Sequence, residues 1–461
     1  MSISAHHPDP RLTAVPQAEE QQSRGHSIHF RIVASLIAVA SCFRVFVCFD
    51  HNPMDYLVSD MSRHWSNGVR FPQGGYTGGA DPIAYQVYVS AVHHLTRDNR
   101  LLVALAAALL SVLMPWTYYR ASRNFGLSKI SSLWVWALIG WAPSLSVIYH
   151  FIMPETLLLF LEGAALWMTA RYLRKGGTEA FVVLVFFWTV ASLTKPTLIP
   201  LAGICTLWAC WKRIPSLRQI AIGATLALAL LLPQAIRSSL AIGFVAPFGN
   251  PWMTRIMLQS DAKLVILDFY GHYQARTHFR FPDKHYEMEF GSPSFYMRSL
   301  EPVSHWAPRR AWTSTKATIV IDSADGENAW KEAYHRFDSG WDTWLQHWRE
   351  NIVLFFFAQS WPESPTGEWD GHLEYRSRWL WAPLVFLVFV LNIREFTHRR
   401  FDLIPVATTL YTLCIALQNT IIMEGRYRKP VEVLLLVNLV WLFGRRTTPL
   451  HQSDSVSATS P

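Results

Sequence analysis

Three carboxylates follow the first apolar run of the chain, at the point where hydrophobic sequence gives way to polar sequence. They are Asp50, Asp55 and Asp60, and Arg63 and His64 come directly after them. A carboxylate that is partly removed from water, but close to a cation, can stay ionised and accept a proton from a hydroxyl group. The cluster therefore has the residue types of a general base with polar groups around it.

The three acids are not equivalent as candidates for that base. Asp60 is favoured because Arg63 follows it by about one helical turn and can keep it ionised. Asp55 ranks second, and Asp50 ranks third because it lies at the edge of the apolar run. The alternative interpretation is that all three are solvated loop charges, with Asp60 capping a short helix.

Further charged residues lie at the ends of other apolar runs or within them. Glu155 follows Pro154 at the start of one run, and Lys195 precedes Pro196 at the end of another. Glu155 alone is also compatible with an ordinary acid in a first helical turn, where the helix dipole favours it. Glu162 and Arg44 lie inside apolar runs and would each need a polar partner there.

A dense basic turn precedes the last apolar run. It contains Arg426, Tyr427, Arg428 and Lys429. The planar fork of an arginine matches phosphate oxygens, and a lysine adds a point charge. The turn therefore indicates a phosphate site, and the alternative is that its cations extend to lipid headgroups.

Long apolar runs must position these residues. Hydrophobic residues make up 51% of the 461 residues and charged residues only 16%, which is too apolar for a soluble domain of this size. The fold class that follows is an all-α polytopic membrane protein with about ten transmembrane helices. The expected spans are 28–49, 101–119, 131–149, 152–170, 180–194, 196–211, 219–242, 379–393, 403–422 and 429–444.

Basic residues in the short loops predict the orientation, because such loops favour the cytoplasm. With about ten spans, five basic clusters fall on one side, and both termini are then cytoplasmic. The first loop and a large mixed segment between the seventh and eighth spans fall outside, together with the turns at Glu155, Lys195 and Arg426. The clusters are Arg120/Arg123/Lys129, Arg171/Arg174/Lys175, Lys212/Arg213/Arg218, Arg394/Arg399/Arg400 and Arg445/Arg446.

The topology divides the chain into five parts. The first apolar run lacks a small-residue cleavage site and is typical of an uncleaved signal anchor. In the large segment, Trp341, Trp344 and Trp348 form one stripe of an expected interfacial helix. The parts are a disordered cytoplasmic tail (1–27), a transmembrane module with its first external loop at 50–100 (28–242), the external segment (243–378), the last helices (379–446) and a second tail (447–461).

Composition also excludes several classes of protein. The net charge of +8 is explained by the basic loops, so no nucleic-acid partner is expected. All five cysteines fall in predicted spans, which leaves the external segments without a disulfide framework. Histidines lack ligand spacing, and no metal site or cofactor is expected.

Taken in order, these features resemble the GT-C superfamily of integral membrane glycosyltransferases, especially its bacterial protein mannosyltransferase and aminoarabinose transferase relatives. The resemblance rests on the acidic first loop (Asp50 to Gly68), Pro154-Glu155, Lys195-Pro196 and Gly425-Arg426-Tyr427-Arg428-Lys429-Pro430. The usual Asp-Glu pair of the family is missing, since the acids stand apart as Asp50, Asp55 and Asp60.

The resemblance implies a donor, an acceptor and a site. The donor is a polyprenyl-phosphate-linked sugar, the acceptor is a hydroxyl on a glycan, lipid or protein, and the membrane is a bacterial inner membrane. A first-loop Asp would be the base. The residues that would bind substrate are Glu155, Arg63, His64, Lys195, Arg426, Tyr427 and Arg428. A transporter or lipid flippase is the alternative, and a glycan-binding membrane scaffold is a third interpretation.

Overall fold

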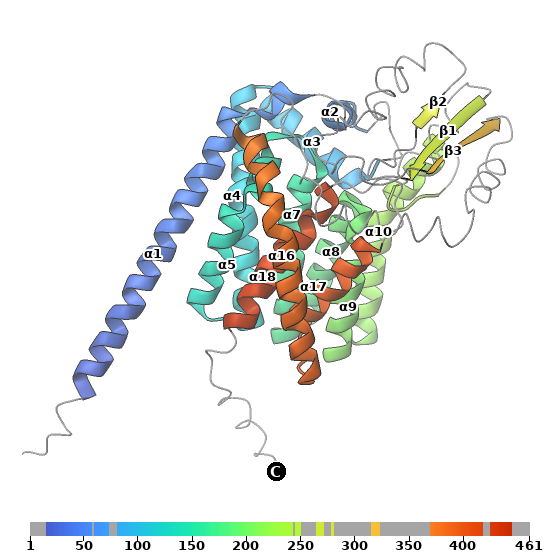
Figure 1. Ribbon diagram of the computed structural model, residues 1–461. Helices are drawn as coiled ribbons and strands as arrows, with labels where there is room; N and C mark the ends of the chain where they lie inside the picture. The colour runs from blue at the N-terminus through green and yellow to red at the C-terminus, as the bar shows by residue number, and fades with distance from the viewer. Residues whose placement is uncertain are drawn as a thin grey trace, which may run out of the picture.

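The computed structural model is a helical bundle (Figure 1). It describes residues 15–57, 60–72, 81–242, 245–249, 264–271, 278–280, 315–322, 369–417 and 425–444. Every expected span contains helix within these ranges. The long helices are α1 (Val15–Asp50), α4 (Arg100–Phe125), α5 (Lys129–Trp141), α7 (Pro154–Lys175), α8 (Thr178–Thr194), α9 (Ile199–Lys212), α10 (Leu217–Ile242), α16 (Trp369–Thr397), α17 (Leu403–Ala416) and α18 (Lys429–Gly444).

Within the described ranges, four helical segments are long and apolar enough to cross a bilayer: Ile28–Asp50, Arg100–Phe125, Leu217–Leu240 and Leu380–Thr397. A fifth span results if the bent pair Lys129–Trp141 and Pro143–His150 is counted as one. The chain is thus a helical membrane protein. The other helices fall short of this criterion, among them the apolar but short α8 and α17.

The first helix corrects one predicted boundary. The sequence assigned residues 1–27 to a disordered tail, but α1 begins at Val15. Residues 17–22 read Gln-Ala-Glu-Glu-Gln-Gln, and all of these have high helix propensity. The polar stretch therefore continues the helix, while the apolar span itself begins at Ile28 as expected.

The helix ends separate into two groups at opposite ends of the bundle. At one end lie η1 (Pro53–Tyr56), α2 (Asp60–Val69), α3 (Ile83–Thr96) and the start of α7 (Figure 1). At the other end, Tyr172 Oη donates to the Arg213 carbonyl oxygen at 3.0 Å, and the Phe125 and Trp441 rings lie 6.2 Å apart. The basic ends of α4, α7 and α9 therefore lie together, away from the acidic first loop.

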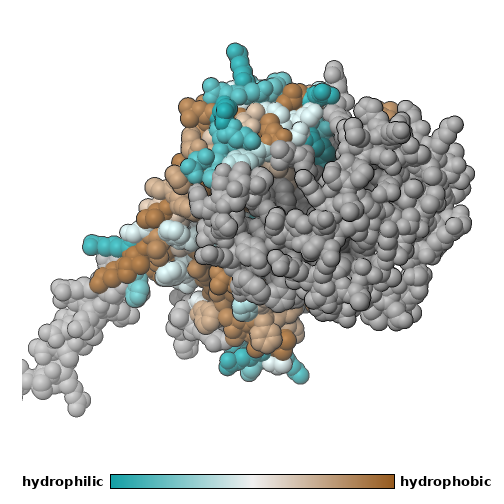
Figure 2. Space-filling view, turned by 45° about the horizontal axis from the view of Figure 1, so that its top comes forward, coloured by the Kyte–Doolittle hydropathy of each residue, from teal (hydrophilic) through white to brown (hydrophobic). Residues whose placement is uncertain are grey.

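The side of the bundle between these ends is apolar. Figure 2 shows brown side chains along the helices, with teal side chains gathered toward the two ends. Leu105, Leu109, Leu228, Leu232 and Phe386 are exposed. Large exposed apolar surface of this kind is typical of contact with lipid.

A sharp break divides the span that begins with α5. The chain bends by 70° before α6 (Pro143–Val147) and η2 (Ile148–His150). Pro143 lacks an N–H and therefore fits the first position of the new helix. The bend leaves backbone carbonyl groups without helical partners inside the bundle.

Arg44 of α1 satisfies those groups. Its Nη2 donates to the Leu145 carbonyl oxygen at 2.7 Å, and its Nη1 donates to Ser146 Oγ at 2.8 Å. Nη1 also lies 3.2 Å from the Ile139 carbonyl oxygen, and Nε donates to the Ser111 carbonyl oxygen at 2.8 Å. The partners that the sequence left open for Arg44 are thus mainly carbonyl oxygens of a broken helix, and the side chain is buried.

Part of the predicted external segment forms a small sheet. Strands β1 (Leu264–Gly271), β2 (His278–Arg280) and β3 (Thr315–Asp322) pair antiparallel in the order β2-β1-β3. The expected interfacial helix with Trp341, Trp344 and Trp348 lies outside the described residues, as does the tail 447–461.

Candidate functional site

The bend after α5 brings Ser144 of α6 to the first turns of α18. Ser144 Oγ donates to Glu432 Oε2 at 2.6 Å, and Arg428 Nε donates to Glu432 Oε1 at 2.6 Å. Lys429 Nζ donates to the Ser144 carbonyl oxygen. All four residues are buried, so their charges act on one another with little screening by water.

A second ion pair lies at the same end of the bundle. Glu155 in the first turn of α7 pairs with Lys195, where α8 ends. Helix α8 stops there because Pro196 disfavours helical backbone at the preceding residue. Lys195 Nζ lies 4.4 Å from the centroid of the Tyr427 ring, a favourable cation–π distance. Lys195 therefore connects α7 and α8 to η5 (Gly425–Arg428).

The two networks adjoin because η5 carries a residue of each. We call them together the boundary cluster. It contains three cations (Lys195, Arg428 and Lys429) and two carboxylates (Glu155 and Glu432). Arginine and lysine side chains gathered in this way can bind an anion such as a phosphate group. Among its cations, Lys195 is the most accessible, with 14% of its side chain exposed.

Asp50 contacts a different part of the broken span. Its Oδ2 lies 3.1 Å from His51 Nδ1. The His51 ring stacks on the His150 ring with centroids 4.7 Å apart and planes 10° apart. His150 is fully buried at the end of η2. Asp50 is therefore placed against the piece of chain that also carries Ser144.

Asp55 and Asp60 have different surroundings. Asp55 pairs with Arg100 at the start of α4, and their side chains are 42% and 63% exposed. Water screens a pair of this kind, so the carboxylate stays accessible at little energetic cost. Asp60 is the first residue of α2, and its side chain lies outside the described residues.

Arg63 and His64 contact the end of the first loop. Arg63 Nε lies 3.6 Å from Asp81 Oδ2, which also accepts a hydrogen bond from Asn67 Nδ2 at 2.9 Å. His64 is buried and meets the Tyr85 ring edge to face at 5.4 Å. The cation that the sequence associated with Asp60 thus neighbours Asp81, which ties α2 to the start of α3.

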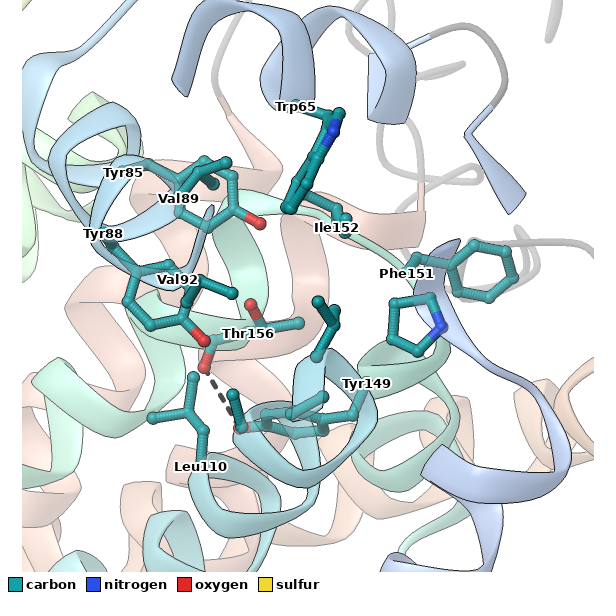
Figure 3. A pocket seen from close by; sticks show the side chains of 14 residues that line it. Trp65, Tyr85, Tyr88, Val89, Val92, Leu110, Tyr149, Phe151, Ile152 and Thr156 are labelled. Atoms are coloured by element: carbon teal, nitrogen blue, oxygen red, sulfur yellow. Dashed lines mark hydrogen bonds between the residues drawn. The ribbon is translucent and has the colours of Figure 1, made fainter. Parts of the chain in front are cut away.

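A small aromatic pocket lies beneath α2 (Figure 3). Trp65 enters it from α2, Tyr85 and Tyr88 from α3, and Tyr149 from η2. Burial raises the pKa of the Tyr85 and Tyr88 phenols above its ordinary value. Both hydroxyl groups therefore remain protonated and can donate hydrogen bonds at the membrane boundary.

The structure thus groups the predicted residues unevenly. It brings Glu155, Lys195, Tyr427 and Arg428 together, and it places Asp50 and Asp55 in separate contacts. Arg426 belongs to η5, but its side chain lies outside the described residues. Where η5 stands, the sequence predicted a basic turn that binds phosphate or extends to lipid headgroups, and the structure buries Arg428 and Lys429.

Sequence reasoning missed several residues of these networks. Glu432 stands four positions after Arg428, a spacing that favours an ion pair on a helix, so it was detectable. Ser144 lies 288 positions from Glu432, and no local pattern indicates that contact. His150 and Asp81 were likewise not singled out.

No family model matches this chain, and none of the curated proteins matches it. Its class therefore follows from the structure: a helical membrane protein with a partly buried, charged site at one end of its bundle.

Proposed function

We propose that this protein is a membrane glycosyltransferase of the GT-C type. It would move a sugar from a polyprenyl-phosphate donor to an acceptor hydroxyl. The observation that carries the proposal is the boundary cluster, which gathers Lys195, Arg428 and Lys429 at one end of the bundle. A lipid monophosphate is an anion that such cations can bind, and the apolar flank of the bundle suits its prenyl chain.

In this proposal the cations of the cluster stabilise the leaving phosphate as negative charge develops on it. Lys195 and Arg426 would contact the phosphate. Arg428 would stabilise the phosphate without touching it, because its Nε donates a hydrogen bond to Glu432 and its side chain is buried. Tyr427 would hold Lys195 in place through its ring.

The acceptor side of the reaction needs a base. A first-loop carboxylate would take the proton of the acceptor hydroxyl, whose oxygen attacks the anomeric carbon as the phosphate leaves, inverting the configuration. Asp55 is the acid whose described contacts supply a cation, Arg100. Asp50 with His51 is the alternative, and Asp60 remains a candidate through its place at the start of α2.

The proposed topology follows the positive-inside rule. About ten spans would place both termini in the cytoplasm and the boundary cluster on the outer face, in a bacterial inner membrane. In a background without native cysteines, Ala91→Cys in α3 should react with an impermeant thiol reagent on intact cells. Lys175→Cys, at the opposite end of α7, should react only after permeabilisation. Labelling of Lys175→Cys from outside would reverse the orientation.

Arg426→Ala tests the phosphate site. The variant should weaken use of a polyprenyl-phosphate sugar by about 1.5 to 3 kcal/mol, the range for a hydrogen bond to a charged group. The measurement is kcat/KM for the donor with purified protein. Arg394→Ala at the other end of the bundle is the matched control and should change nothing. If Arg426→Ala keeps the kcat/KM of the parent, as Arg394→Ala should, the turn only anchors to lipid headgroups.

The alternative function is a lipid flippase or transporter. The observation that favours it is Glu162, a carboxyl group buried inside the bundle, because intramembrane acids often mark transport pathways. Purified protein in vesicles with a polyprenyl-phosphate sugar separates the two. Formation of a glycosylated acceptor supports the transferase, whereas movement of intact donor between leaflets without transfer supports the alternative.

A further inference from the structure

Glu162 is a buried carboxyl group that the proposed reaction does not use. It lies in α7 with no exposed surface, one residue before the point of close approach to α4. Neither carboxyl oxygen makes a hydrogen bond of regular geometry among the residues that the structure describes, and the Tyr118 hydroxyl group is its polar neighbour. Because a buried, unpaired carboxylate is very costly, this arrangement calls for an explanation.

Helices α4 and α7 pack closely at the residue that follows Glu162. A Cβ placed on Gly163 would lie 2.0 Å from Thr117 Oγ1 and 2.9 Å from Thr117 Cβ. Only a glycine leaves room for the Thr117 side chain here, and small residues of this kind are common where helices pack inside membranes. Glu162 is therefore buried beside a close helix–helix contact.

The tyrosine hydroxyl groups that face Glu162 already donate hydrogen bonds to backbone carbonyl oxygens. Tyr118 of α4 donates its hydroxyl hydrogen to the Leu159 carbonyl oxygen at 2.9 Å. Tyr411 of α17 donates its own to the Thr197 carbonyl oxygen at 3.2 Å. Cys205 of α9, also buried, carries only a weak S–H donor. No lysine or arginine pairs with Glu162 within the described part of the chain.

An ionised carboxylate in this place would meet acceptors and no strong donor. A protonated carboxyl group has one O–H to donate, and the Tyr118 hydroxyl oxygen still has a lone pair to accept it. We propose that Glu162 is a proton-binding site inside the bundle, held as a neutral acid that donates to Tyr118 and so ties α7 to α4.

Infrared spectroscopy of the full-length protein in lipid tests this proposal independently of any transfer activity. At neutral pH the protein should show the carbonyl stretch of a protonated carboxylic acid, and Glu162→Gln should remove it. Glutamine matches the neutral acid in shape, so the variant should fold. Glu179→Gln is the matched control, because Glu179 of α8 is 80% exposed and pairs with Arg171. A spectrum that Glu162→Gln leaves unchanged in this region would overturn the proposal.

A second test uses the unsubstituted protein. Dicyclohexylcarbodiimide partitions into membranes and reacts with protonated carboxyl groups. The carboxyl O–H adds across one C=N bond, its proton passes to nitrogen, and the O-acylisourea rearranges to a stable N-acylurea, so no group leaves. Mass spectrometry should locate this adduct on Glu162. Adducts confined to exposed carboxyl groups, with none on Glu162, would count against a neutral acid there.

Discussion

Arg428→Met should lower the free energy of unfolding by about 3 to 5 kcal/mol, because it removes the ion-pair partner of Glu432 inside the bundle. Both side chains are fully buried, and Arg428 Nε lies 2.6 Å from Glu432 Oε1. Removing one partner loses the attraction while the desolvation of the other remains. Chemical unfolding of the purified protein in detergent, followed by tryptophan fluorescence, measures the difference.

The double variant Arg428→Met/Glu432→Leu provides the control. Replacing a buried ion pair by apolar residues of similar volume is often neutral in stability. Ser144 Oγ would lose its partner on Glu432, which should leave a residual cost of about 1 kcal/mol. The double variant should therefore be more stable than the single one. A single variant as stable as the parent would show that the two charges are not paired in the folded protein.

Replacing the catalytic first-loop acid by asparagine should reduce turnover by about 100-fold or more, because asparagine keeps the shape but cannot accept a proton. Asp50→Asn, Asp55→Asn and Asp60→Asn are to be compared in a transfer assay with purified protein. One of them should show the large loss with an unchanged unfolding midpoint. Asp55 is the first choice from its contact with Arg100.

Asp98→Asn is the matched control for this series. Asp98 also lies at the acidic end of the bundle, where it contacts His93 at 2.5 Å and is 46% exposed. Its replacement should leave turnover within a few-fold of the parent. If all three first-loop variants do the same while Glu155→Gln abolishes transfer, the base belongs to α7 and the first-loop assignment is wrong.

Helix positions were largely predictable from the sequence, because apolar runs and prolines act locally. Helix α8 ends at Thr194, directly before Lys195 and Pro196, as the Lys-Pro pair indicates. The start of α1 was misplaced because a polar stretch was taken to be a tail, although Gln, Ala and Glu favour helix. The 70° break at Ala142 was not foreseen, since a proline can begin a helix as readily as end one.

The sequence by itself determined that this is a helical membrane protein with its unusual acids and its basic turn at the ends of apolar runs. Only the tertiary structure decided which of these residues meet. The turn before α18 reads as a group of cations for phosphate, but packing buries Arg428 and Lys429 against Glu432 and Ser144. The physical reason is that hydropathy and spacing report local conformation, whereas a contact across 288 positions is fixed by how helices pack and bend.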